Sequence, residues 1–117
     1  MKLLLIVNYP PYGTEHCYNA LRLATALLRN DPEGQIAIFL LSDAVLAAKT
    51  GQNTPQGYYN AEGMLERVID CKGQVLVCGT CMDTRGLSEA DMLIGARRST
   101  MYELAAMTLE ADKVVVF

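Results

Sequence analysis

Short apolar runs alternate along the chain with segments in which apolar residues recur every three to four positions. A continuous apolar run is typical of a strand buried on both faces of a parallel sheet, whereas the longer spacing is typical of a helix with one buried face. The apolar runs that predict strands lie at residues 2–8, 36–41, 74–78 and 114–117, and a short fourth strand is expected at residues 96–98. The segments that predict helices lie at about residues 14–30, 44–48, 60–72, 88–94 and 100–110. This alternation predicts an α/β fold, a parallel sheet with helices on both faces.

Polar residues mark the expected ends of the helices. Thr14 and Asn60 are predicted N-caps, and Gly73 follows a helix where a left-handed residue is favoured. Capping boxes are predicted for Ser88 with Asp91 and for Thr100 with Glu103. Residues 50–59 form the longest polar stretch, and a loop of this length is expected to be functional or mobile.

Length and composition narrow the classes of protein. A chain of 117 residues predicts a single domain over residues 1–117. The apolar content of 51% is high, which favours a subunit interface that hides some of it. A net charge of −3 without a basic run disfavours nucleic-acid binding. No apolar stretch reaches the roughly 20 residues of a membrane span, and we expect a cytoplasmic protein with reduced cysteines.

Several polar side chains follow the expected strands. In parallel sheets, ligands bind beyond the carboxyl ends of the strands, which share one edge. The residues expected to bind a ligand along this edge are Asn8, Tyr12, Ser42 and Asp43. Asp43 is also the predicted cap of the helix at 44–48. Arg98 ends the weakest of the predicted strands, and Arg97 and Arg98 are interpreted as solvated or inter-subunit residues.

Cys78 ends the third predicted strand, and Cys81 follows three positions later. Cysteine reacts as a thiolate, and at its ordinary pKa only about 3% is ionised at pH 7. Backbone N–H groups of the following loop, together with Arg85, are expected to favour the anion. The loop residues expected to bind ligand beside the thiols are Gly79, Thr80 and Gly86. The pattern predicts a reactive site built from Cys78, Cys81 and Arg85.

The cysteine pair allows other interpretations. A zinc site needs two more ligands, and only His16, Cys17 and Cys71 are left to supply them, so neither a metal nor a cofactor is expected. A thioredoxin-type redox pair belongs at the start of a helix, whereas the residues after Cys81 are expected to form a loop. The cysteines can also be structural, in a non-catalytic module that binds a small ligand or a protein.

Taken together, the motifs resemble the DsrE/DsrF-like superfamily, and most closely its YchN-like branch. The segments that carry the resemblance cover essentially the whole chain. They are residues 8–13, 21–24, 39–45, 51–52, 57–58, 78–81, 85–86 and 111–114. The resemblance implies a three-layer α/β/α sandwich with a five-stranded, mainly parallel sheet, assembled into homo-oligomers that are commonly trimers or hexamers.

The resemblance also implies a chemistry. In relatives that relay sulfur, a cysteine at the end of the third strand carries a persulfide, and this position corresponds to Cys78, with the family's Arg-Gly pair at Arg85 and Gly86. Cys81 is shared with the YchN-like branch and not with the sulfur-relay subunits. The expected function is a cytoplasmic sulfur carrier, similar to a sulfurtransferase, that accepts sulfane sulfur from a donor protein and passes it to an acceptor thiol. A binding module and a dithiol oxidoreductase remain the alternatives.

Overall fold

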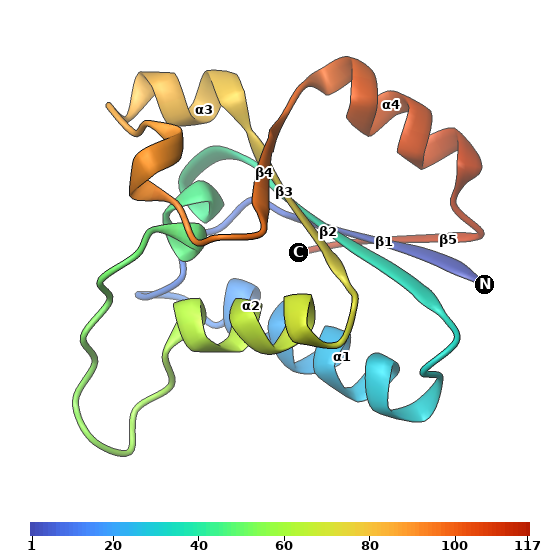
Figure 1. Ribbon diagram of the computed structural model, residues 1–117, viewed down its shortest axis with the longest axis horizontal. Helices are drawn as coiled ribbons and strands as arrows, with labels where there is room; N and C mark the ends of the chain where they lie inside the picture. The colour runs from blue at the N-terminus through green and yellow to red at the C-terminus, as the bar shows by residue number, and fades with distance from the viewer.

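A computed structural model describes residues 1–117 as one parallel sheet covered by helices on both faces (Figure 1). The strands are β1 (Lys2–Val7), β2 (Gln35–Leu40), β3 (Gln74–Cys78), β4 (Ala96–Ser99) and β5 (Lys113–Val116). Their order in the sheet is β4-β3-β2-β1-β5, and every neighbouring pair is parallel. The predicted α/β fold class is therefore confirmed, including the short fourth strand.

The helices form the outer layers of the sandwich. Helices α1 (His16–Asn30) and α2 (Ala61–Asp70) pack on one face, and α4 (Met101–Glu110) lies on the other (Figure 1). Helix α3 (Gly79–Thr84) continues directly from the carboxyl end of β3. Two short 3-10 helices, η1 (Ser42–Ala48) and η2 (Glu89–Asp91), complete the chain. No helix combines the length and the apolar character that crossing a membrane requires.

The core lies between the three central strands and the α1–α2 layer. Phe39 and Leu76 are fully buried on β2 and β3. Helix α1 buries one face at helical spacing, with Cys17, Ala20, Leu21, Ala24 and Leu28 directed inward. Burial raises the pKa of Cys17 to about 12, so this thiol stays protonated and serves as packing.

The last strand differs from its prediction as a buried strand. β5 is an edge strand that pairs only with β1. Val114 and Val116 on it are 39% and 62% exposed. Helix α4 covers this part of the sheet incompletely, since Leu104 is the one buried residue of that helix. The apolar run at residues 114–117 therefore predicted the strand correctly but did not predict that it would be exposed.

Three predicted helix ends, at Thr14, Asp43 and Gly73, are wrong. Helix α1 begins at His16, one residue later than a cap at Thr14 would give, and its N-cap is Glu15. Thr14 Oγ1 is buried without a hydrogen-bond partner. The left-handed residue after α2 is Lys72, with φ of 70°. Gly73 is needed for space instead, because a methyl group there would lie 2.6 Å from Val68 Cγ1. The Asn60 cap and the Ser88–Asp91 capping box are confirmed. Thr100 accepts the Glu103 N–H, but the reciprocal bond of the predicted capping box is absent, since the Glu103 carboxylate accepts from Arg97 and Ser99 instead.

Candidate functional site

Cys78 lies at the junction of β3 and α3. It is the last residue of the strand and the N-cap of the helix, and its Sγ accepts a hydrogen bond of 3.3 Å from the Cys81 N–H. The prediction of a loop after Cys81 is wrong, since residues 79–84 are helical. The six-residue segment contains Gly and two Thr, which favour helix weakly, and no apolar repeat. Its helix is held by the Cys78 cap and by Met82, which is buried beneath it.

The Cys78 thiol is shielded from solvent, with only 7% of the residue exposed. Burial raises the pKa of Cys78, and a hydrogen bond with the Cys81 side chain raises it further. Backbone N–H groups of Cys81 and Thr80 act in the opposite direction. The expected lowering by backbone donors is therefore present, but burial outweighs it and the net pKa is raised.

Cys81 Sγ has its own backbone donor. The Ser42 N–H donates to it at 3.2 Å from the start of η1, just beyond the carboxyl end of β2. Ser42 has φ of 54°, in the left-handed region that a non-glycine residue seldom adopts. Each of the two sulfurs thus accepts one backbone N–H.

Arg85 joins the two elements that carry these donors. Its Nε and Nη2 lie 3.0 and 2.9 Å from Asp43 Oδ1, and its Nη1 donates at 3.1 Å to the Cys81 carbonyl. The guanidinium therefore ties the end of α3 to η1 through these oxygens. Asp43 is not the predicted helix cap, because η1 begins before it and has no side-chain cap. Gly86 follows with φ of 68°, which lets the chain turn away from α3.

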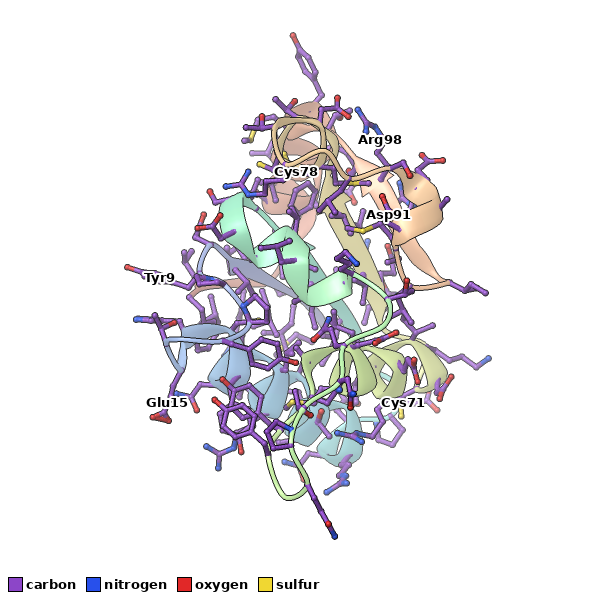
Figure 2. All side chains as sticks on the ribbon, turned by 90° about the vertical axis from the view of Figure 1, so that its left-hand side faces the viewer. Tyr9, Glu15, Cys71, Cys78, Asp91 and Arg98 are labelled. Carbon is purple, nitrogen blue, oxygen red and sulfur yellow. The ribbon has the colours of Figure 1, made fainter.

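Arg98 is a cation beside the Cys78 site that was not predicted from the sequence as a site residue. It lies on β4, the neighbour of β3, and its two Nη atoms donate to the Asp83 carboxylate at 2.9 and 2.8 Å. The guanidinium lies over Gly79, where a methyl group would be 2.7 Å from Arg98 Cζ. The Asp83 hydrogen bond raises the pKa of Arg98, and negative charge on Cys78 would raise it too. Figure 2 shows Cys78 and Arg98 at the same end of the molecule.

Other predicted site residues lie apart from the thiols. Asn8 Nδ2 donates to the Phe117 carbonyl at 3.4 Å, at the carboxyl ends of β1 and β5. The Tyr12 hydroxyl instead fastens the 50–59 loop, donating to Gln52 and accepting from the Ala61 N–H. The structure brings together Cys78, Cys81, Ser42, Asp43, Gly79, Thr80 and Arg85.

The site is an open edge. Neither Cys78 nor Cys81 lines any of the five best-defined hollows of the surface. The structure contains no group of three or more His, Cys, Asp or Glu side chains placed to hold a metal ion. All four cysteines are free thiols. The arrangement can present one sulfur, with a second beside it, to a reactant that approaches the carboxyl edge of the sheet.

Comparisons with known proteins match the whole chain. The family model described as DsrE/DsrF-like matches residues 1–117. Protein YchN of Escherichia coli (strain K12) is 41% identical over 116 residues, covering 99% of this chain and 98% of YchN. An uncharacterized protein of Methanocaldococcus jannaschii is 44% identical over 119 residues, with both chains covered in full.

Solved structures agree in fold. The crystal structure of the E. coli YchN protein aligns with a TM-score of 0.95 at 41% identity, covering 99% of this chain and 98% of that one. A protein of unknown function from Methanobacterium thermoautotrophicum, MTH1491, aligns with a TM-score of 0.82 at 10% identity over 99% of this chain and 98% of its own. At that identity the second likeness concerns the fold alone.

Proposed function

Because the chain belongs to the DsrE/DsrF-like family, which is associated with sulfur relay, we propose that it is a cytoplasmic sulfur carrier that holds sulfane sulfur as a persulfide on Cys78. One observation supports this most. The Cys78 sulfur lies at the carboxyl edge of the sheet, with a backbone donor at 3.3 Å from Cys81, the residue that carries the second thiol. These neighbours can hold a terminal sulfur atom through hydrogen bonds.

The transfer conserves atoms and electrons. The Cys78 thiolate attacks the outer sulfur of a donor persulfide, the S–S bond of the donor breaks, and the donor leaves as a thiolate. That thiolate takes up the proton that Cys78 lost, so no external oxidant or reductant takes part. In the second half, an acceptor thiolate attacks the outer sulfur on Cys78, and Cys78 leaves as a thiolate.

The surrounding residues have distinct proposed roles. Arg98, held over Gly79, stabilises negative charge on Cys78, since a guanidinium favours a nearby anion. Arg85 positions Cys81 through the Cys81 carbonyl and Asp43. Ser42 supplies the N–H for the second sulfur. The edge residues Thr80, Gly86, Asn8 and Tyr12 remain proposed contacts for the donor or acceptor.

We propose that a second copy of the chain completes this open edge. The exposed apolar side chains of α4 and β5 form one candidate interface, which we call the α4–β5 face. Its members are Met101, Tyr102, Leu109, Val114 and Val116, each between 39% and 91% exposed. Exposed apolar side chains of this kind favour self-association. The assembly we propose is a trimer or a hexamer, as the resemblance to the family implies.

A dithiol oxidoreductase is the second candidate. The helix directly after Cys78 has the strand-to-helix position that such motifs use, and the Cys81 N–H donates to the Cys78 sulfur. In this alternative, both sulfurs are oxidised to a 78–81 disulfide while a substrate disulfide is reduced to two thiols.

Intact mass spectrometry separates the two candidates. The reduced protein is incubated with a donor persulfide, beside Cys78→Ala and Cys81→Ala variants. A sulfur carrier gains one reductant-labile sulfur atom in the wild type and in Cys81→Ala, and none in Cys78→Ala. Loss of two hydrogens, with a 78–81 link and no added sulfur, would instead favour the oxidoreductase.

A further inference from the structure

The groove between α1 and α2 carries three arginine side chains without a carboxylate partner. Arg22 and Arg29 project from α1 and Arg67 projects from α2, and all three are exposed around a hollow of about 390 Å³. The ion pairs of the chain involve other cations, at Lys2, Arg85, Arg97 and Arg98. Like charges side by side destabilise a fold, so folding alone does not explain this cluster in a chain of net charge −3.

An aromatic stack borders the same groove. Tyr58 stacks on Tyr59 with ring centroids 4.7 Å apart, and Tyr59 stacks on Tyr18 at 4.1 Å. The Arg22 guanidinium lies 5.3 Å from the centre of the Tyr18 ring. Tyr58 is 52% exposed, so part of its ring is open to solvent. The stack therefore offers an open aromatic surface beside a cation.

Hydrogen bonds fix the tyrosine stack in place. The Tyr59 hydroxyl donates to the Pro11 carbonyl at 3.0 Å, from the loop that follows β1. Asn60 Nδ2 donates to the Gln52 carbonyl at 3.1 Å, and Gln52 Nε2 donates to the Ala47 and Lys49 carbonyls at 2.9 Å each. The 50–59 loop is thus held across its width, and the ring surface is present before any ligand arrives.

The rings and the arginines share one cavity. A hollow of about 360 Å³ is lined by Tyr18, Arg22, Tyr58, Tyr59, Met64 and Arg67. It continues into the first hollow, because Arg22, Met64 and Arg67 line both. Asp70 lines a third hollow together with Arg29 and Arg67, which also line the first hollow, whereas the hollow beside the tyrosines is lined by no carboxylate. Negative charge is therefore best accommodated at the end where the tyrosines lie.

We propose that this hollow binds a nucleoside phosphate, with the base stacked on Tyr58 and the phosphate between Arg22 and Arg67. Aromatic rings stack on bases without needing a matched hydrogen-bond pattern. Arginine binds phosphate through paired N–H groups, which suits this anion better than a single ammonium would. Arg29 lies two helical turns, roughly 10 Å, from Arg22, and it extends the cationic track for a longer phosphate chain.

The hollow is separate from the sulfur site. Figure 2 places Cys78 at one end of the molecule, whereas Glu15 and Cys71, which flank α1 and α2, lie toward the other end. The net charge of −3 favours a single small nucleotide over a long polynucleotide, which the whole chain would repel. The proposal stands or fails independently of sulfur transfer.

Isothermal titration calorimetry with ADP at low ionic strength tests the site. The wild type is expected to bind one ADP per chain with saturation. A variant with Arg22→Gln and Arg67→Gln together should bind at least about tenfold more weakly, since charge-assisted hydrogen bonds are lost. Neither side chain makes an ion pair, so the fold should be retained. Lys113→Gln, which removes an exposed charge on β5, is the matched control and should bind as the wild type does.

A second variant separates stacking from charge. Tyr58→Leu should weaken ADP binding about tenfold and leave pyrophosphate binding unchanged, because base stacking contributes to the first ligand alone. Absence of saturable ADP binding up to millimolar concentration would overturn the proposal. Undiminished binding to the doubly substituted variant would overturn it too, as would an equal response of ADP and pyrophosphate to Tyr58→Leu. Sulfur loading of every variant should match the wild type.

Discussion

The ion pair between Arg97 and Glu103 joins the edge strand β4 to helix α4, and its removal gives a quantitative test. Arg97 Nη1 and Nη2 each donate at 2.8 Å to a Glu103 oxygen, and the Ser99 hydroxyl donates to the same carboxylate. Ser99 is the β4 residue paired with Cys78. Glu103→Gln keeps an oxygen for Ser99 and the backbone cap at Thr100, and it removes the charge.

The size of the effect follows from the pKa of Glu103. Hydrogen bonds from Arg97, and then from Ser99, lower this pKa from its ordinary 4.5 to about 2. Such a change corresponds to at most about 3 kcal/mol in the free energy of unfolding. However, 35% of the Glu103 side chain and 54% of the Arg97 side chain are exposed. Solvent screening reduces the expected loss to about 1 kcal/mol.

The loss depends on pH with a definite sign. A carboxylate with a lowered folded-state pKa stabilises the fold above its unfolded pKa, and this contribution is lost as the pH falls through the folded value. The wild type should therefore be about 1 kcal/mol more stable than Glu103→Gln at pH 7. The difference should shrink below pH 4.5 and vanish near pH 2.

Urea unfolding followed by circular dichroism measures this difference, at one fixed protein concentration so that self-association does not shift the midpoint. Glu33→Gln, in the exposed turn before β2, is a matched control that removes a charge without an ion pair. A difference between wild type and Glu103→Gln that stayed constant from pH 7 to pH 2.5 would refute the electrostatic argument.

Three further predictions concern packing, the sulfur site and assembly. Gly73→Ala should lower the free energy of unfolding by about 1–3 kcal/mol, because the new methyl group would lie 2.6 Å from Val68 Cγ1. Urea titration measures this loss, and an unchanged unfolding midpoint would contradict the prediction. Gly79→Ala should displace Arg98 and slow alkylation of the site thiol at pH 7.5 while the urea midpoint changes little; unchanged alkylation would remove Arg98 from the site. Val116→Lys places a charge on a 62% exposed position of the α4–β5 face and should shift light-scattering mass toward the monomer; an unchanged mass would exclude this face as the interface.

The strands of the core could be predicted because apolar runs are their direct consequence. β2 and β3 are buried on both faces, so every residue from Ile36 to Leu40 and from Val75 to Cys78 is buried. The short strand β4 contains two exposed arginines and was the weakest prediction. β4 is held by hydrogen bonds to β3, and such pairing cannot be predicted from the hydrophobic pattern of one segment.

The site could be predicted in part. Cys78 and Cys81 lie at the expected sheet edge, since the end of a strand fixes their position. Helix α3 was missed because it is six residues long and buries only Gly79 and Met82, too few residues for a helical repeat. Arg98 is twenty positions from Cys78 in the sequence, and only the β3–β4 pairing brings it near.

The balance of forces on the Cys78 thiol could not be predicted from spacing. A chain that turns just after a cysteine places backbone N–H groups near the sulfur, and such groups lower the pKa of the thiol. The extent of burial depends on how the whole chain packs, and in the folded chain burial has the larger effect on the pKa of Cys78.

The most direct test of sulfur carriage is a single-turnover chase. Protein loaded with isotopically labelled sulfur from a donor persulfide is freed of donor, mixed with an acceptor thiol such as glutathione, and followed by mass spectrometry of both partners. We predict that the label leaves Cys78 and appears in the acceptor persulfide with matching kinetics, in the wild type and in Cys81→Ala, while Cys78→Ala carries none. Label that stays on the protein, or that is transferred equally by Cys78→Ala, would contradict sulfur carriage through Cys78.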